Sequence, residues 1–297
     1  MRQKMNLSAL NTDFDTDTEC RAALEGLRWP NGVRCLRCDS AKISRISTRK
    51  QFDCDACRYR FSVTTGTIFH DSHLPLQKWF LAILLMCEAK KGISANQMKR
   101  TLGVAHKTAW YLCHRIRAAM AEAQPEPLAG TVEVDETYIG GGRGVGAGNR
   151  DRHKMVLAAI QRGGPVRMGR SKTNRASKVE LHGFIKAHVG DETINIYTDE
   201  AKGYLGIGDE NTTHATIAHG RGEYVRGDVH TNTVESVFGL FKRAVVGSFH
   251  QISTKHLDRY LDEFEFRFNN RKNPYLFRDT VTRLVRADAM PYEQLTA

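Results

Sequence analysis

The sequence lacks any hydrophobic run long enough to cross a membrane. Its longest, Trp79 to Cys87, is far shorter than the roughly 20 apolar residues that a spanning helix needs. The first eight residues contain no apolar segment of the kind found in a secretory signal peptide. Internal repeats and low-complexity segments are absent as well. These absences argue against membrane and exported proteins, and we expect a soluble protein of the cytoplasm.

The cysteines do not form an even set, as a disulfide framework would require. There are 7 of them, and four fall in two C-x-x-C pairs separated by residues 39–53, enough chain for a short hairpin. Two such turns each aim two thiolates at one point, which is the arrangement of a tetrahedral zinc site. Four unrelated buried cysteines would not explain the matched spacing. We therefore predict a zinc ribbon completed by a strand over residues 61–69, with four Zn²⁺ ligands: Cys35, Cys38, Cys54 and Cys57.

Acidic residues are too few to balance the basic ones. The chain has 44 Lys and Arg against 33 Asp and Glu, a net charge of +11, and a surplus of this size favours a polyanionic partner such as DNA. A basic enzyme without such a partner is the alternative. The length of 297 residues suits two or three domains.

Residues 76–120 show a helical pattern in three parts. A mostly apolar helix over 76–90 is followed by a short helix from Ser94 to Leu102, a turn at Gly103 and a longer helix over 105–120. A short helix, a glycine turn and a basic helix are typical of a helix-turn-helix, although a plain helical hairpin is the alternative. We predict that the third helix contacts DNA through Lys107, Thr108, Tyr111, His114, Arg115 and Arg117.

After a proline-containing linker at residues 124–127, the pattern changes to strands and helices. Strands are predicted at 131–139, 155–160, 166–169, 193–198 and 215–218, and helices at 176–188, 230–246 and 254–270. The alternation of the first strand places Glu133 and Asp135 on one face and Glu136 on the other. The fourth strand ends at Asp199. We expect the glycine-rich segment 140–154 to be a flexible loop that touches DNA.

The helix predicted over residues 230–246 has two contrasting faces. Its apolar stripe consists of Val234, Val237, Phe238, Phe241 and Val245. The other face carries small or hydrogen-bonding groups, with Asn232 and Glu235 near its start and Lys242 and Arg243 two turns later. This composition indicates a helix lying on a site, with Lys242 directed toward an anion. An ordinary amphipathic helix is the alternative.

The order of these elements is that of a ribonuclease-H-like fold, an α/β class with a mixed sheet and flanking helices. In that fold the first strand lies centrally and the strand after the helix lies beside it, so Asp135 and Asp199 become neighbours that Glu235 can join. Converging carboxylates require cations, and hard oxygen ligands suit Mg²⁺ or Mn²⁺. Two such ions per site would support an in-line phosphoryl transfer.

Three motifs resemble the signatures of bacterial insertion-sequence transposases of the DDE type: V-D-E-T-Y-I-G-G, Y-T-D-E and H-T-N-T-V-E-S-V-F-G-L-F-K-R. The likeness extends from the ribbon to R-F-N-N-R-K-N-P near the end. It implies two metal ions, DNA strand transfer and catalytic acids at Asp135, Asp199 and Glu235, with Lys242 as a trailing cation. Relatives can have an Asn at the third position, so Asn232 is the alternative ligand. We favour Glu235 because a carboxylate binds a divalent cation better than an amide does.

The sequence thus predicts a transposase that binds terminal inverted repeats and cleaves and joins DNA as a homo-oligomer associated with the bacterial nucleoid. Its double-stranded partners would be the element ends and the target, with Arg243 as a further contact. A DNA-binding regulator with an inert catalytic domain and a structure-selective nuclease are the alternatives. The predicted domains are a ribbon (1–74), a helix-turn-helix (75–124) and a catalytic domain (128–297).

Overall fold

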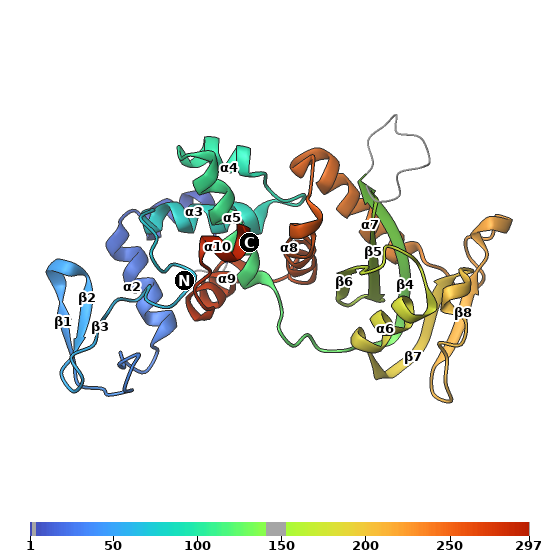
Figure 1. Cartoon of the computed structure of the whole chain (residues 1–297), viewed down its shortest axis with the longest axis horizontal. Helices are drawn as coiled ribbons and strands as arrows, with labels where there is room; N and C mark the ends of the chain where they lie inside the picture. Colours follow the sequence, from blue (N-terminus) through green and yellow to red (C-terminus); the bar gives the residue numbers. More distant parts are fainter. Residues whose placement is uncertain (2–3, 141–152, 297) are drawn as a thin grey trace. The chain divides into compact units, whose positions relative to one another are not determined.

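The computed structural model describes residues 1, 4–140 and 153–296 (Figure 1). The chain divides into two compact units. The first comprises residues 1–89, 93–120 and 273–297, and the second comprises residues 90–92 and 121–272. Most of the predicted glycine-rich loop, residues 141–152, lies outside the described residues. No helix within the described ranges is both long and apolar enough to cross a membrane.

The first unit joins a small sheet to a set of helices. Its elements are α1 (Leu7–Asp13), α2 (Asp17–Arg28), β1 (Ile43–Ile46), β2 (Gln51–Cys54), β3 (Arg60–Phe61), α3 (Leu76–Glu88), α4 (Ala95–Leu102), α5 (His106–Met120), α9 (Leu276–Arg286) and α10 (Tyr292–Thr296). The strands form an antiparallel sheet in the order β1-β2-β3. The hairpin between the two cysteine pairs is therefore confirmed.

The strand predicted over residues 61–69 is wrong beyond Phe61. Hydroxyl side chains close turns there instead: the Thr65 hydroxyl accepts a hydrogen bond from the Ser62 N–H at 2.9 Å, and the Thr67 hydroxyl donates to the Thr64 carbonyl at 2.8 Å. Ser and Thr offer the backbone such local partners in competition with a strand ladder.

The three predicted helices, α3, α4 and α5, and the turn at Gly103 are all present. Ser94 caps α4, because its hydroxyl accepts a hydrogen bond from the Gln97 N–H at 3.1 Å. Gly103 ends α4 with φ +60°, a left-handed conformation that glycine adopts without steric cost. The sequence signals for this turn were therefore local and sufficient.

The C-terminal residues belong to the first unit, which differs from the predicted catalytic domain of 128–297. Phe277 of α9 is buried, with its ring 5.9 Å from Phe80 of α3 and 6.3 Å from Phe14. The Thr280 hydroxyl lies 3.3 Å from the Cys87 sulfur. The apolar stripe of α9 completes the core of the N-terminal helices, and this long-range packing leaves no mark in the local pattern.

The second unit is built on a five-stranded mixed sheet. Its strands are β4 (Leu128–Gly140), β5 (His153–Gln161), β6 (Val166–Arg170), β7 (Val189–Asp199) and β8 (Thr213–Ile217), in the order β6-β5-β4-β7-β8. β4 is antiparallel to β5 and parallel to β7, and β7 is parallel to β8. β4 is therefore central with β7 beside it, and the predicted ribonuclease-H-like order is confirmed.

Helices cover both faces of this sheet (Figure 1). One face packs against α6 (Lys178–His188) through a core that includes Val132, Val134 and Ile196. The other packs against α7 (Asn232–Ala244) and α8 (Leu257–Asn269). Four of the five predicted stripe residues of α7 are buried, and the fifth is partly buried: Val234, Val237, Phe238, Phe241 and Val245.

Candidate functional site

The four predicted zinc ligands meet at one point in the ribbon. All their sulfur atoms lie within 4.8 Å of one another, and Cys35 to Cys57 and Cys38 to Cys54 are each 3.6 Å apart. Zinc–sulfur bonds of about 2.3 Å in a tetrahedron place sulfurs roughly 3.8 Å apart. Burial opposes ionisation of Cys35, but hydrogen bonds from the backbone N–H groups of Cys38 and Arg37 lower its pKa to about 6, whereas burial raises the pKa of Cys57. The spacing of the four sulfur atoms, rather than these pKa values, is what fits Zn²⁺.

The strand pairing of the second unit brings two of the predicted acids together. Glu133 of β4 is in register with Tyr197 of the parallel strand β7. Asp135 and Asp199 each lie two residues further along, on the same face of adjacent strands. That face is the one covered by α7, because Val132, Val134 and Ile196 point to α6. The predicted adjacency of the two aspartates thus follows from the observed register.

Burial raises the pKa of Asp135 to about 8, and the negative charges of neighbouring acids add to the effect. Those neighbours include Glu136, Asp199 and Glu235. Burial also raises the pKa of Asp199, despite the hydrogen bond that its Oδ1 accepts from the Ala201 N–H at 2.9 Å. Carboxylates that resist ionisation beside one another favour a cation between them.

Glu136 faces the opposite side of the sheet, as its position in the alternation predicted. The Tyr204 hydroxyl donates a hydrogen bond to its Oε2 at 2.5 Å, and burial raises the pKa of Glu136. Tyr204 belongs to the core on the α6 side. Glu136 is therefore part of the supporting structure rather than of the face that carries Asp135.

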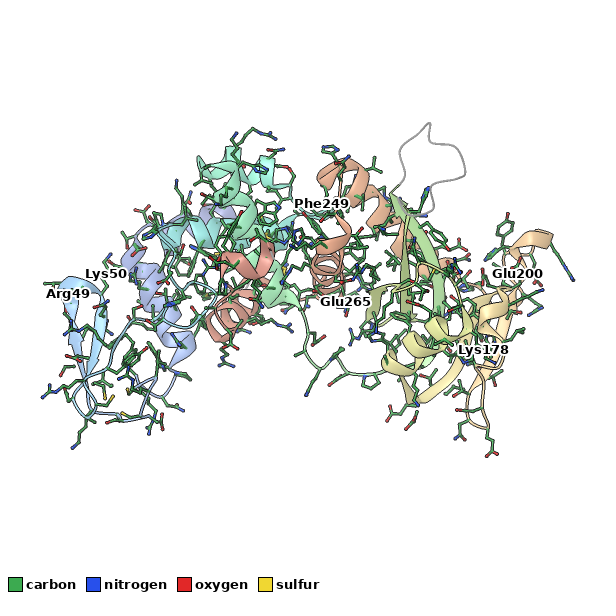
Figure 2. All side chains as sticks on the ribbon, in the orientation of Figure 1. Arg49, Lys50, Lys178, Glu200, Phe249 and Glu265 are labelled. Carbon is green, nitrogen blue, oxygen red and sulfur yellow. The ribbon has the colours of Figure 1, made fainter. Side chains whose placement is uncertain are left out.

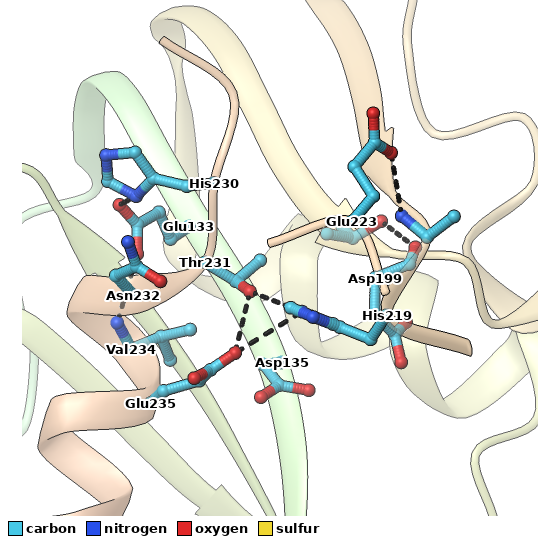
Figure 3. Close-up of polar contacts among 12 residues, drawn as sticks. Glu133, Asp135, Asp199, His219, Glu223, His230, Thr231, Asn232, Val234 and Glu235 are labelled. Atoms are coloured by element: carbon cyan, nitrogen blue, oxygen red, sulfur yellow. Dashed lines mark hydrogen bonds and ion pairs between the residues drawn. The ribbon is translucent and has the colours of Figure 1, made fainter. Parts of the chain in front are cut away.

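Glu235 projects from the first turn of α7 toward the same region (Figure 3). Its Oε1 accepts a hydrogen bond from the Thr231 hydroxyl at 3.1 Å and lies 3.3 Å from Nε2 of His219. His219 is held in turn by Glu200, directly after β7, whose Oε2 accepts its backbone N–H at 2.8 Å. Glu200 is labelled in Figure 2. Asn232 is exposed one helical turn before Glu235, so both candidates for the third ligand remain on the accessible side of α7.

The acids are less tightly gathered than the cysteines. Among the residues that the structure describes, the cysteine cluster is the only group of three or more metal-ligating side chains whose ligand atoms all lie within 4.8 Å. Asp135 and Asp199 lie on the sheet face that α7 covers, and, beyond the effect of burial, the negative charges of Asp199 and Glu235 raise the pKa of Asp135. The ligand atoms of the three acids are nevertheless not as close together as the four sulfur atoms. Their hard oxygen donors suit Mg²⁺ or Mn²⁺ in chemistry.

The outer face of α7 forms a shallow groove of about 520 Å³ lined by Asn232, Glu235, Ser236, Gly239, Leu240 and Arg243. The cation that lines this groove is thus Arg243. Lys242 is exposed on the same helix but is not among the described residues that line the groove. The groove exists because small residues, Ser236 and Gly239, occupy this face of the helix, and the Arg243 guanidinium places a positive charge in its wall.

Three of the residues predicted to contact DNA on α5 are buried: His114, Arg115 and Arg117. Arg115 donates hydrogen bonds to the Ile68 carbonyl and, at 2.7 Å, to the His70 carbonyl. Burial contradicts the predicted DNA contact of His114 and Arg117. Arg115 lines a groove beside α5, but its guanidinium is occupied by these two carbonyl groups, which contradicts the predicted contact there as well.

The N-terminal end of α5 stays accessible. Lys107 and Thr108 are exposed, and Tyr111, which donates a hydrogen bond to the Met290 carbonyl, is half-buried. Together with Asp71 and Tyr292 they line a groove of about 660 Å³. A helix-turn-helix typically reads DNA with the first residues of its recognition helix, so this is the part of α5 placed to do so.

His219, Thr231 and Arg162 were not predicted for the site. Arg162 follows β5 and reaches Glu133, its Nε lying 2.7 Å from Oε1. No local pattern marks an arginine in a β-turn as part of a distant cluster, and His219 lies in a single 3₁₀ turn, His219–Arg221, that is too short to show periodicity. Thr231 adjoins Asn232 in the H-T-N-T motif, which was the one available signal.

The fold and the two sites define a ribonuclease-H-like protein that carries a zinc ribbon. Residues 127–269 match the family model of the ISXO2-like transposase domain, and residues 15–60 match that of the transposase zinc-ribbon domain. The chain is 31% identical over 274 residues, 84% of this chain and 90% of the relative, to the "Uncharacterized protein in transposable element ISH50" of Halobacterium salinarum. It belongs to the ISXO2-like transposase family, a family of enzymes that act on DNA. That relative is archaeal, and the bacterial origin stays a prediction.

Proposed function

We propose that this protein is a DDE-type DNA transposase that cleaves the strand at each end of its element and joins the 3′-hydroxyl to target DNA. The observation that carries the proposal is the shared face of Asp135 and Asp199 on adjacent parallel strands, covered by the helix that bears Glu235. Divalent cations bound there would supply an activated hydroxyl and stabilise the leaving oxygen.

The protein's own residues have separate tasks in this scheme. Asp135, Asp199 and Glu235 hold the cations, and Asn232 orients Glu235 or a water molecule. A phosphate of the DNA end lies against Arg243 in the α7 groove, where a guanidinium offers paired donors, with the Lys242 ammonium nearby on the same helix.

The first unit supplies recognition of the inverted repeats. Its zinc ribbon and the N-terminal end of α5, with Lys107 and Thr108 exposed, contact double-stranded DNA. Synapsis of two element ends requires two copies of the chain, so the working species is a homo-oligomer on DNA. The buried residues of α5 take no part in these contacts.

The test is cleavage and joining of the element's own flanking DNA with Mg²⁺ or Mn²⁺. We expect wild-type protein to cut at the element ends and to join them to a target, and Asp135→Asn and Asp199→Asn to abolish both steps while binding to the ends persists. End binding without cleavage under any divalent cation would support an inert regulator. Cleavage of branched DNA irrespective of end sequence would support a structure-selective nuclease.

A further inference from the structure

A fully buried carboxylate ties the start of α7 to the central strand. Glu133, on β4 two residues before Asp135, is 0% exposed. Its Oε2 accepts hydrogen bonds from the N–H groups of Thr233 at 2.7 Å and Val234 at 3.0 Å, and its Oε1 accepts from the Thr233 hydroxyl at 2.8 Å. Glu133 and Val234 are labelled in Figure 3. Those N–H groups lie in the first helical turn, which has no acceptors of its own. Because an unpartnered buried carboxylate is costly, the two elements are held together at this point.

Glu133 takes over the task that an N-cap residue normally performs. Thr231 occupies the N-cap position of α7, yet its side chain makes no capping hydrogen bond, although threonine is a common cap. Its hydroxyl instead donates to Oε1 of Glu235 at 3.1 Å and lies 3.0 Å from Nε2 of His219. Capping by Glu133 thus leaves Thr231 available to hold the candidate metal ligand.

Arg162 extends the same connection to the segment before α7. Its Nε lies 2.7 Å from Oε1 of Glu133, while Nη1 donates to the Asp228 carbonyl at 2.8 Å and Nη2 to the His230 carbonyl at 3.1 Å. The imidazole Nδ1 of His230 is also 3.2 Å from Glu133. One guanidinium therefore neutralises the buried carboxylate and fixes the backbone that leads into the helix.

Arg162 also contacts β7, the strand that carries Asp199. Its guanidinium lies 4.9 Å from the ring centre of Tyr197 on β7, two residues before Asp199. The Glu133–Arg162 pair thus contacts β4, β7 and α7, in each case within two residues of Asp135, Asp199 or Glu235. Because the second unit supplies these acids from three separate elements, their spacing depends on such a shared contact.

We propose that Glu133 and Arg162 are positioning residues that set the separation of Asp135, Asp199 and Glu235 and thereby the affinity of the site for divalent cations. The proposal rests on the proposed function and deepens it. Neither residue is a metal ligand in this scheme. Supporting residues around a metal site typically change metal affinity or activity by about 10–100-fold when replaced.

The test compares Glu133→Gln with a matched control in the same unit. Glu265 of α8, labelled in Figure 2, is also a mostly buried carboxylate. It accepts hydrogen bonds from the Met168 N–H at 2.9 Å and from the Arg167 guanidinium at 3.1 Å. The full-length proteins are titrated with Mn²⁺, the free ion being counted by electron paramagnetic resonance, and are assayed for cleavage and thermal unfolding. We expect Glu133→Gln to weaken Mn²⁺ binding about 10–100-fold and Glu265→Gln to leave it unchanged.

Two further variants separate positioning from stability. Glu133→Gln combined with Arg162→Gln removes the uncompensated charge, so it should regain stability without regaining Mn²⁺ affinity. Arg162→Lys keeps the charge but loses the fork of donors, so it should bind Mn²⁺ more weakly even if Glu133→Gln does not fold.

The outcomes distinguish this proposal from the function on which it rests. Wild-type Mn²⁺ affinity in folded Glu133→Gln, or in Arg162→Lys if Glu133→Gln fails to fold, would overturn the proposal while leaving the transposase assignment intact. Recovery of Mn²⁺ affinity together with stability in the double variant would overturn it too. If the wild-type protein bound no Mn²⁺, there would be no cation site for Glu133 and Arg162 to set up, and the proposal would be overturned as well. Failure of the proposed function shows separately, as Mn²⁺ binding without cleavage of element ends by the wild-type protein.

Discussion

The zinc ribbon and the acid site differ in how their ligands are brought together. The cysteines come from two turns within residues 35–57, and their sulfur atoms all lie within 4.8 Å. The acids come from β4, β7 and α7, across residues 135–235: Asp135 and Asp199 share a sheet face, and the helix over that face carries Glu235. Within the described residues, these three acids do not form a cluster as close as that of the cysteines. A site made of adjacent turns is completed by local geometry, whereas one made of three elements depends on the groups that fix those elements.

The two sites also have opposite effects on the fold. The thiolates sit in a small module with little core of its own, where bound zinc supplies folding free energy outright. The carboxylates are buried beside one another, and burial raises the pKa of both Asp135 and Asp199. We therefore expect metal removal to unfold the ribbon. In the absence of divalent cations, we expect removal of one carboxylate to raise the free energy of unfolding of the second unit.

The largest expected effect comes from breaking the zinc site. Replacing Cys54 and Cys57 by Ser leaves two thiolates, too few for a structural site. We expect metal content to fall from one zinc per chain to none and the ribbon to unfold, while the core of the second unit, which contains none of these residues, keeps its structure. Metal analysis and amide hydrogen exchange measure both effects. Zinc retained in the double variant would contradict the assignment of these ligands.

A smaller effect is expected from Asp135→Asn in protein that keeps its zinc but receives no added divalent cation. Burial raises the pKa of Asp135 in the folded protein to about 8, whereas the pKa of an aspartate in the unfolded chain is about 4. Between these values the folded state binds more protons, so the free energy of unfolding falls as pH rises, by at most about 1.4 kcal/mol per pH unit. The variant should lose this slope and be more stable than wild-type at pH 8. The measurement is urea unfolding of both proteins over pH 4–8. If the free energies of unfolding of the variant and the wild-type protein changed with pH in the same way, the raised pKa of Asp135 would be contradicted.

The smallest expected effect separates the exposed and buried cations of α5. Lys107→Ala should lower the salt slope of DNA binding by about one unit, since one phosphate contact is lost, without changing stability. Arg115→Ala should instead destabilise the first unit by about 1–3 kcal/mol for the buried carbonyl groups left unpaired and leave the slope of the folded protein unchanged. A reduced slope in folded Arg115→Ala would show that this arginine reaches DNA after all.

Much of the fold was predictable because its signals are local. The cysteine spacing, the Ser94 cap with the Gly103 turn, and the element order of the second unit all gave the observed structure. The features that could not be predicted from the sequence depend on tertiary packing. Arg115 on a basic helix has the same local pattern whether it faces solvent or the interior, and α9 contains no sign that its stripe packs on α3.

In the candidate site, too, some features could be predicted from local patterns and others could not. Alternation alone placed Glu133 and Asp135 on one face of their strand, and the order of strands made Asp135 and Asp199 neighbours. The role of Glu133 as the cap of α7 could not be predicted, since it depends on the contact between a strand and a helix 100 positions apart. Arg162 joins the same cluster from a turn, where no periodicity marks its direction.

The central claim is that Glu235, rather than Asn232, completes a divalent-cation site with Asp135 and Asp199. The most direct measurement counts Mn²⁺ bound by full-length wild-type, Glu235→Gln and Asn232→Ala proteins. We expect about two ions per chain in the wild-type protein, loss of at least one in Glu235→Gln, and the wild-type number in Asn232→Ala. Loss in Asn232→Ala with the full number kept in Glu235→Gln would contradict the claim and assign the third ligand to the amide.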